Sequence, residues 1–279
     1  MKKRFAKIYL EISNVCNRSC AFCPGTTRAA RFLSVSEFAL LCGKLRPYTD
    51  YLYFHLMGEP LLHPALADFL RIAGELGFRV ILTTNGTLLP QCADSLLAAP
   101  ALHKVNISLQ SFEANDGGTL ETYIADCAEF ARRCSTVGKL CVLRLWNKNG
   151  LDGRNGDIIS ILERSFPPPW RESRGSFALG DRLWLEPGEK FDWPDLSLDS
   201  GGSAVFCYGL RDQLGVLCDG TVVPCCLDHN GDISLGNLFT EELDSIMSTD
   251  RFQAIYDGFS RRVAVEPLCR RCGYAKRFG

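Results

Sequence analysis

Long apolar runs are absent from this sequence of 279 residues. A membrane-crossing helix needs about 20 consecutive apolar residues, and the basic N-terminus is followed only by Ile8–Leu10 before Glu11, which is too short for a secretion signal. Positive and negative residues are nearly balanced, since the formal net charge is −1. This balance argues against non-specific electrostatic binding to nucleic acid or anionic lipid. We therefore expect a cytoplasmic protein with no membrane and no nucleic-acid partner. Internal repeats and low-complexity segments are also absent.

The sequence does have alternating strand and helix patterns. Apolar, β-branched runs predict strands at Lys7–Ile12, Tyr51–Leu56, Phe78–Thr83, Lys104–Leu109 and Lys139–Trp146. Between and after these strands, helices are predicted at Val35–Leu45, Pro64–Leu76, Leu88–Ala98, Leu120–Cys134 and Asp157–Ser165. This order predicts an α/β fold with a parallel sheet covered by helices. Arg182–Glu186 would add a sixth strand. Five or six units favour a partial (β/α)6 barrel over a complete barrel of about 250 residues.

Composition divides the chain into three predicted parts. Residues 1–165 form the α/β core. Residues 166–204 contain consecutive prolines, glycines and isolated tryptophans, which predicts a linker or barrel-closing segment. Residues 205–279 form a small cysteine-rich module, in which extended runs on both sides of Asp219-Gly220 predict a β-hairpin and Glu241–Met247 predicts a helix.

Cysteine is unusually frequent, with 14 in the chain. The chain is too long, and lacks the signal peptide, for a small disulfide-stapled secreted domain, so clustered thiols favour metal binding. Cys16, Cys20 and Cys23 form a Cys-x3-Cys-x2-Cys loop directly after the first predicted strand, where (β/α) folds place their chemistry. Thiolates are the usual ligands of a four-iron cluster, and three of them leave one iron open. A partial zinc site is the alternative, but zinc normally takes four ligands, and no histidine lies in this loop.

The Cys16–Cys23 loop resembles the signature of the radical SAM superfamily. The resemblance implies a [4Fe–4S] cluster whose open iron is chelated by the amino and carboxylate groups of S-adenosylmethionine (SAM). Met57-Gly58-Glu59-Pro60 is similar to the Gly-Gly-Glu-Pro motif of that family, which contacts the methionyl amino group. Met57 replaces the first glycine, and Glu59 keeps the carboxylate.

Two further segments resemble the same family, in the same order along the chain. Thr84-Asn85-Gly86 would contribute Asn85 to the cofactor site, although this tripeptide is also a common turn. Asn106–Gln110 would contribute Ser108 and Gln110, which are expected to face the ribose and the amino acid part of SAM.

A second set of cysteines lies in the C-terminal module. Cys207, Cys225 and the Cys269-x2-Cys272 pair could bind zinc tetrahedrally. Their pattern also resembles the shortened SPASM domain called twitch, which implies one auxiliary [4Fe–4S] cluster held by these four cysteines. Cys226 could exchange roles with Cys225, because adjacent residues of a strand point to opposite faces.

The resemblance implies reductive cleavage of SAM to a 5′-deoxyadenosyl radical, which takes a hydrogen atom from the substrate. The auxiliary cluster would then accept an electron, as in related dehydrogenases that oxidise a sugar-like alcohol. A small alcohol or amino-sugar-like substrate and a low-potential donor such as flavodoxin or ferredoxin are the implied partners. The alternative is a maturase that modifies a peptide or protein side chain. A non-catalytic zinc or iron–sulfur protein is a more distant alternative, because a purely structural cluster gains nothing from an open iron.

Two residues are candidates for direct catalysis. His55 lies at the end of the second predicted strand, beside Met57-Gly58-Glu59-Pro60, and is a candidate general base because histidine titrates near neutral pH. Arg144 on the fifth predicted strand would point into the barrel and meet an anionic or hydroxyl-bearing substrate. The structural alternatives are a satisfied core histidine and an arginine in a salt bridge at the barrel rim.

Overall fold

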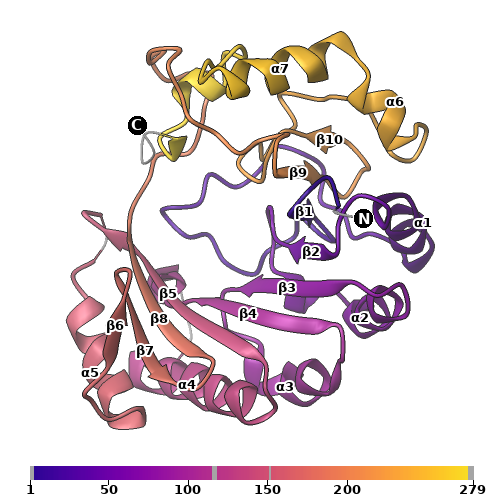
Figure 1. The fold of residues 1–279 in the computed structure, drawn as a ribbon. Coiled ribbons are helices and arrows are strands. Elements are labelled where there is room, and N and C mark those ends of the chain that lie inside the picture. The colour runs from indigo at the N-terminus through magenta and orange to yellow at the C-terminus, as the bar shows by residue number, and fades with distance from the viewer. Residues whose placement is uncertain (1–2, 115–117, 151, 276–279) are drawn as a thin grey trace.

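The computed structural model describes residues 3–114, 118–150 and 152–275. In this part of the chain one ten-stranded sheet has the order β10-β9-β1-β2-β3-β4-β5-β8-β7-β6 (Figure 1). Its central strands are parallel: β1 (Lys7–Leu10), β2 (Tyr51–Phe54), β3 (Arg79–Thr84), β4 (Leu102–Ser108), β5 (Leu140–Lys148) and β8 (Leu183–Glu189). These six strands curve into an unclosed partial barrel, which confirms the predicted α/β fold class.

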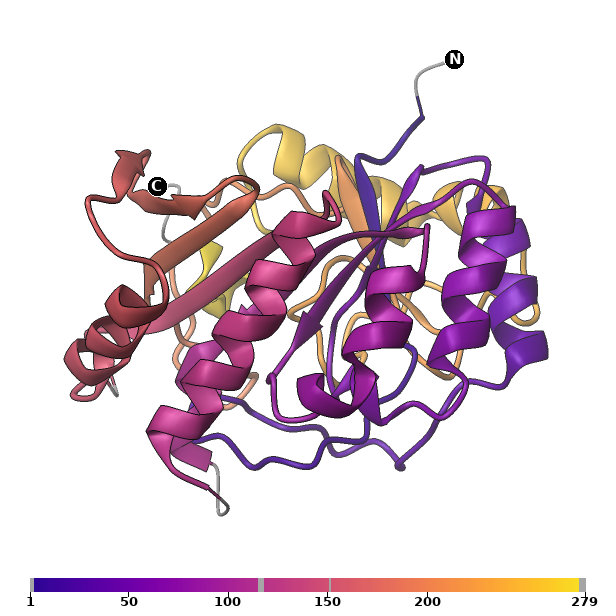
Figure 2. The same ribbon diagram turned by 90° about the horizontal axis from the view of Figure 1, so that it is seen from below.

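Helices cover the outer face of the curved sheet, as the view from below shows (Figure 2). They are α1 (Val35–Leu45), α2 (Leu66–Glu75), α3 (Leu89–Ala98), α4 (Leu120–Thr136) and α5 (Asn155–Ser165). The first of them begins at a capping box, in which Ser34 accepts from the Glu37 backbone and the Glu37 side chain bonds back to Ser34. This reciprocal pair satisfies backbone N–H groups that a helix start leaves unpaired.

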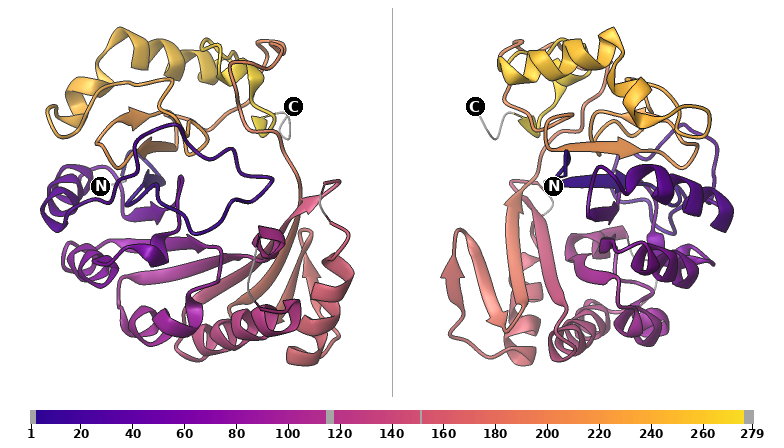
Figure 3. Two further views of the ribbon diagram at one scale, coloured as in Figure 1. Left: turned by 180° about the vertical axis from the view of Figure 1, so that it is seen from behind. Right: turned by 45° about the vertical axis from the view of Figure 1, so that its right-hand side comes forward.

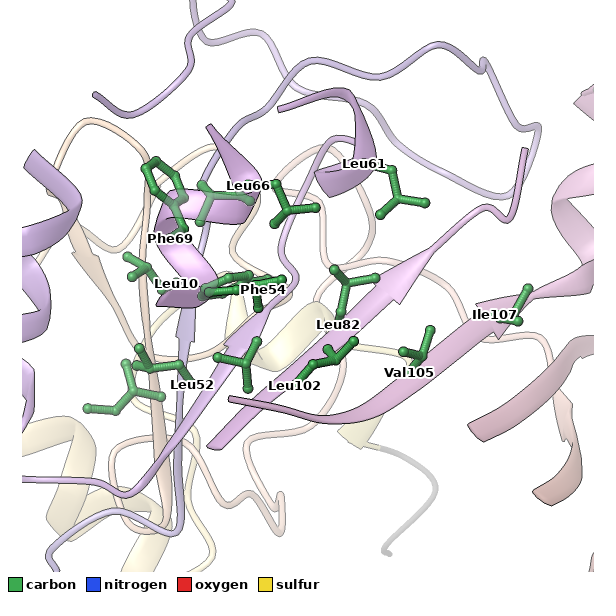
Figure 4. Packing of buried hydrophobic residues seen from close by; sticks show 14 of the residues in the cluster. Leu10, Leu52, Phe54, Leu61, Leu66, Phe69, Leu82, Leu102, Val105 and Ile107 are labelled. Carbon is green, nitrogen blue, oxygen red and sulfur yellow. The ribbon is translucent and has the colours of Figure 1, made fainter. Parts of the chain in front are cut away.

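The main core lies between these helices and the sheet (Figure 4). Alternate strand residues such as Leu52 and Phe54 point to this side and are almost fully buried, and Phe38 of α1 stacks on Phe69 of α2 with 4.1 Å between ring centroids. Each fully buried side chain of this size stabilises the fold by about 1.5–3 kcal/mol. Because the outer face supplies the core, polar residues are tolerated on the inner face.

The segment at 166–204, which we expected to be a linker or to close the barrel, contributes three strands. β8 lies where a sixth parallel strand was predicted, and β7 (Ser176–Gly180) and β6 (Arg171–Ser173) extend the sheet beyond it in antiparallel order. The domain boundaries themselves stay a prediction.

The C-terminal segment is joined to the same sheet. The predicted hairpin is formed by β9 (Gln213–Val216) and β10 (Val222–Val223), with Gly220 at φ +86° in the turn. β9 pairs in parallel with β1, from Lys7↔Gln213 to Leu10↔Val216. The pairing protects the edge of the first strand and holds the C-terminal cysteines beside the strand that leads into the first cysteine loop.

Two helices follow the hairpin. α6 (Leu243–Met247) lies within the predicted helix, and α7 (Asp250–Ser260), whose bounds the sequence analysis did not give, begins at the cap residue Thr249. In Figure 3 (left) the indigo loop after β1 lies between the yellow C-terminal segment and the magenta strands. No helix in the described ranges is long and apolar enough to span a membrane.

Candidate functional site

The first cysteine loop follows β1, as predicted. The backbone N–H of Cys23 donates to the Cys20 carbonyl over 3.0 Å, so the loop turns back on itself. Cys16 and Cys23 are exposed and Cys20 is partly buried. Burial, followed by the neighbouring thiols of Cys23 and Cys16, raises the pKa of Cys20 to about 12. The three thiols therefore share one neighbourhood that is open to solvent.

The Met57–Pro60 turn packs directly against the start of this loop. Gly58 has φ +76°, and a Cβ there would lie 2.5 Å from the Ser13 carbonyl oxygen and 2.8 Å from that of Val15. The backbone N–H of Glu59 donates to the same Val15 carbonyl over 2.8 Å. The position at which the turn comes closest to the cysteine-loop backbone is thus Gly58. Met57, which replaces the first glycine of the family motif, is buried there.

Glu59 is a buried carboxylate, 1% exposed, that joins two loops. Its Oε1 accepts hydrogen bonds from the Leu61 N–H (3.0 Å) and the Thr84 hydroxyl (2.7 Å), and its Oε2 accepts from the Asn85 N–H (2.7 Å). Burial raises its pKa to about 7, against the opposing effect of these bonds. The Glu59 carboxylate therefore holds its own turn and the loop at Thr84 and Asn85 together. A contact between this carboxylate and the ammonium group of SAM stays a prediction.

Asn85 reaches the cysteine loop from the end of β3. Its Nδ2 donates to Asn17 Oδ1 over 2.9 Å and lies 4.0 Å from Cys16 Sγ. The structure thus brings together the three segments that the sequence analysis placed in one cofactor site: the cysteine loop, Met57–Pro60 and Thr84–Gly86.

The end of β4 supplies the fourth segment. Ser108 is the last residue of β4, and its carbonyl accepts from the Ser111 hydroxyl over 2.7 Å. Gln110 is 7% exposed, and its Oε1, like Oδ1 of Asn106, is buried without a hydrogen-bond partner among the described residues. Buried polar atoms nearly always have partners, so these two oxygens fit a site that a polar ligand completes.

The four predicted cysteines of the C-terminal segment line one cavity of about 30 Å³. Cys207, Cys225, Cys269 and Cys272 all border it, and among the described residues of its wall Asp228 alone carries a charge. The Cys272 N–H bonds to the Cys269 carbonyl, and the Gly209 N–H lies 3.3 Å from Cys207 Sγ. Four partly buried thiols in an apolar wall fit the donor set of a four-cysteine cluster. Across the described ranges, no three His, Cys, Asp or Glu side chains are close enough to hold a single ion.

Cys225 and Cys226 point to different surroundings. Cys225 borders the cysteine-lined cavity, and burial, then Cys226 and the other cavity thiols, raise its pKa. Cys226 instead packs beside a small cluster that contains Tyr9 and Leu56, and a hydrogen bond with Tyr9 partly opposes the effect of burial on its pKa. The geometry therefore favours Cys225 as the fourth ligand.

A buried ion pair that the sequence analysis missed connects the two cysteine sites. Glu11, 1% exposed, accepts from Arg28 Nη2 over 2.7 Å and from the backbone N–H groups of Met57 and Cys218, each over 3.2 Å. Arg28 Nε also donates to the His229 carbonyl over 3.0 Å. Hydrogen bonds and an ion pair thus connect the segment that follows the cysteine loop to the C-terminal segment. A lone Glu and Arg in the sequence carry no signal that they pair across the fold.

The two proposed catalytic residues both face the inside of the partial barrel. Burial, then the positive charges of Arg144 and Lys7, lower the pKa of His55 to about 4, so its imidazole is neutral at neutral pH. Arg144 Nε lies 3.7 Å from Glu186 Oε2, its guanidinium lies 4.5 Å from the centre of the Trp146 ring, and Nε has no hydrogen-bond partner in the described part of the chain.

Comparison with protein families gives two matches. The radical SAM superfamily matches residues 10–144, and the iron–sulfur cluster-binding SPASM domain matches residues 207–273. The two matched ranges contain all seven cysteines that border the two sites.

Curated relatives match only over part of their length. A tungsten-containing aldehyde ferredoxin oxidoreductase cofactor-modifying protein of Pyrococcus furiosus is 33% identical over 90 residues, which cover 29% of this chain and 24% of the relative. A GTP 3′,8-cyclase of Chlorobaculum tepidum is 34% identical over 118 residues, covering 38% and 33%. The chain thus spans no more than a third of the length of these relatives.

Solved structures share the whole fold at low sequence identity. BtrN in complex with AdoMet and 2-DOIA superposes with a TM-score of 0.62 and 18% identity, covering 98% of this chain and 94% of BtrN. Streptococcus suis SuiB bound to the precursor peptide SuiA gives 0.63 and 15%, covering 98% and 71%. At this level of identity the likeness establishes the fold alone.

Proposed function

We propose that this chain, which belongs to the radical SAM superfamily and carries a C-terminal SPASM domain, catalyses a two-electron oxidation of a small alcohol or amino-sugar-like substrate. The observation that supports this is the pairing of an open three-cysteine loop with a four-cysteine cavity on one continuous sheet. The two domains imply SAM and two iron–sulfur clusters. When bound, these groups supply a 5′-deoxyadenosyl radical that removes a hydrogen atom and a second redox centre for the remaining electron.

The side chains around the first site hold and orient the cofactor in this proposal. Cys16, Cys20 and Cys23 are the protein ligands of the first cluster. The buried Glu59 fixes the loop at Thr84 and Asn85 against the cysteine loop, and the unpaired Oε1 of Gln110 offers an acceptor to a hydroxyl or ammonium group of SAM. Such preorganisation matters because radical chemistry tolerates neither loose positioning nor access of water.

Inside the barrel, Arg144 and His55 would act on the substrate. Arg144 has a free N–H donor at Nε for a substrate oxygen. The neutral imidazole of His55 would receive the proton that leaves when the substrate is oxidised. It is a weak base beside Lys7 and Arg144, and a bound anion would raise its pKa by offsetting these charges. A low-potential donor such as flavodoxin or ferredoxin would deliver the first electron.

The layout, one core followed by one cysteine-rich module, resembles 2-deoxy-scyllo-inosamine dehydrogenase, and BtrN, solved with 2-DOIA, shares the fold over nearly the whole chain. Maturation of a peptide is the alternative, and it is favoured by the equal structural likeness to SuiB, solved with its precursor peptide SuiA. Both proposals use the same first site and differ in what enters the barrel.

The test is SAM cleavage by the anaerobically reconstituted protein with dithionite, first alone and then with a panel of cyclitols, sugars, amino sugars and sugar acids. We expect one member to raise 5′-deoxyadenosine formation and to be oxidised in equal amount. Deuterium at the reacting carbon should appear in 5′-deoxyadenosine. Cleavage that responds only to peptides would replace the small-molecule proposal with the maturase, and absence of SAM cleavage from a fully iron-loaded protein would contradict both.

A further inference from the structure

The inner face of the sheet carries an excess of positive charge. Strand pairing places Tyr9, Tyr53, Ile81 and Lys104 in one row across β1 to β4, and Ser108, Arg144 and Glu186 in another across β4, β5 and β8. Residues two apart on a strand share a face, so Lys7 belongs to the same face as Tyr9. Among these positions Lys7, Lys104 and Arg144 are cations, and Glu186 is the only carboxylate.

Two of these cations, Lys7 and Arg144, lie at aromatic rings. The Lys7 ammonium lies 5.2 Å from the centre of the Tyr9 ring and 5.1 Å from that of Tyr53. The Arg144 guanidinium lies over Trp146, and its distance of 3.7 Å from Glu186 is too long for a hydrogen bond. Rings attract a cation but provide no acceptor for its N–H donors. On the inner face, Nε of Arg144 is a buried donor with no hydrogen-bond partner among the described residues.

Electrostatic effects agree with this geometry. Burial and the charge of Arg144 lower the pKa of Lys7 and of Lys104, while Cys226 and Asp212 oppose this shift at Lys7 and Glu186 opposes it at Lys104. Burial, then Arg144 and Lys7, lower the pKa of His55. The cations thus repel one another inside the barrel, and burying like charges without partners costs stability. A bound anion would relieve this cost.

A hollow of about 300 Å³ lies along the same strands. Lys104, Glu186 and Trp184 line it from the sheet, and Arg174 and Ser176 line it from the β6–β7 hairpin. This volume is at the lower end of about 300–1,000 Å³ for small-molecule sites. The hollow adds a fourth cation, Arg174, at the side of Lys104.

We infer that the substrate is an organic anion, a hydroxyl-bearing small molecule whose phosphate or carboxylate group is held inside the barrel by Lys7, Lys104 and Arg144. The inference rests on the proposed function, because it names the substrate class of the same site. It also selects among the substrates considered above: a protonated amino sugar would bring a further positive charge toward three cations, whereas a sugar phosphate or sugar acid would neutralise them.

The first experiment uses inorganic phosphate and the reconstituted holoenzyme with SAM. Melting temperatures are measured with phosphate and with sodium chloride at equal ionic strength, for the parent, Lys7→Met, Lys104→Met and Arg164→Met. Arg164 lies on α5 and is exposed, so its variant controls for loss of one positive charge. We expect phosphate to raise the melting temperature of the parent and of Arg164→Met more than chloride does, and most of this gain to be lost in both lysine variants.

The lysine variants should fold, because methionine fills the space of a desolvated lysine without its charge. Equal melting temperatures in phosphate and chloride for the parent would overturn the inference, and so would a phosphate effect that survives in both lysine variants. Cleavage of SAM in the absence of substrate is measured on the same samples. Its persistence when the phosphate effect is missing would leave the proposed function standing while removing the anionic substrate.

The second experiment identifies the anionic group by anaerobic calorimetry. It compares four sugars that share one hexose ring and differ in charge: glucose 6-phosphate, glucuronate, glucose and glucosamine. We expect one of the two anionic sugars to bind at least about ten-fold more tightly than glucosamine, and that advantage to vanish in Lys104→Met but not in Arg164→Met. The stronger of the two assigns phosphate or carboxylate. Glucosamine binding as tightly as both anions would contradict the inference.

Discussion

The two cysteine sites of this protein differ in exposure and in the number of cysteines. The first is a loop after β1 whose three thiols are partly or fully open to solvent, and its position is set by hydrogen bonds of neighbouring loops to Glu59 and Asn85. The second is an apolar cavity bordered by four partly buried cysteines from three separate segments of the chain. Three thiols that face solvent could leave a position for a reactant on a bound cluster, whereas four thiols around one cavity could ligate a cluster completely.

Strand pairing explains how one chain can hold both cysteine sites. β9 pairs with β1, so the strand that leads into the open loop also carries the module that closes the cavity. Glu11 and Arg28 then join the loop to the turn between β9 and β10 and to the residues after β10. The two sites are therefore placed by one continuous sheet.

The largest expected effect comes from removing the open site. Cys16→Ala/Cys20→Ala/Cys23→Ala should abolish SAM cleavage, because no other described cysteines lie in this loop, and should lower the iron content from roughly eight per chain to about four. Iron and acid-labile sulfide after anaerobic reconstitution, together with 5′-deoxyadenosine formation, measure both effects. If the variant still cleaved SAM, the loop would not be the catalytic site.

The four-cysteine site should respond differently to two adjacent substitutions. Cys225→Ala removes a thiol from the cavity and should cost most of the second cluster, about four irons per chain, while SAM cleavage without substrate continues. Cys226→Ala is the matched control, because its side chain lies beside Tyr9 and not in the cavity, and it should retain the full iron content. The reverse pattern would show that Cys226 is the ligand. One zinc in place of the second set of irons would make the cavity structural and remove its role in substrate oxidation.

The grouping of the cysteines into two sites could be predicted from the sequence, because it depends on spacing within short segments. Cys16, Cys20 and Cys23 lie within one loop, and Cys269 and Cys272 within one turn, so their grouping needs no knowledge of the fold. The strand and helix periodicity of residues 7–165 likewise reflects which face each side chain buries, and it located the strands to within a few residues.

The features that could not be predicted depend on contacts between distant segments. Glu11 and Arg28 are far from Cys218 and His229 in sequence, and no motif marks their pairing. The inward direction of Lys7 and Lys104 depends on the register of four strands, because a slip of one residue would turn both side chains outward. β6 and β7 were missed for a similar reason: they are short, and nearby prolines and glycines dominate their pattern.

The link between the two sites can be broken at Arg28. Arg28→Met leaves the Glu11 carboxylate buried without its ion-pair partner, and breaking a buried pair in this way costs about 3–5 kcal/mol in the free energy of unfolding. Because Glu11 then still needs a partner, Glu11→Gln/Arg28→Met should recover part of that loss. Denaturant unfolding of the parent, both single variants and the double variant measures the coupling. Additive losses would mean that the pair does not join the loop to the C-terminal segment.

The smallest effect is expected inside the open site, at Glu59. Glu59→Gln keeps the shape of the side chain but replaces one acceptor oxygen by an NH2 group, so one of the donors from Leu61, Thr84 or Asn85 loses its acceptor. An unsatisfied buried group costs about 1–3 kcal/mol. Leu61→Ala, in the same turn, leaves the carboxylate and its three donors in place and is the control for lost packing. We expect Glu59→Gln to weaken SAM binding, measured by calorimetry on the reconstituted protein, while the second cluster stays fully loaded. Equal loss of iron from both sites would show instead that Glu59 supports the whole fold, and the open loop would then owe its position to the sheet and not to its own hydrogen bonds.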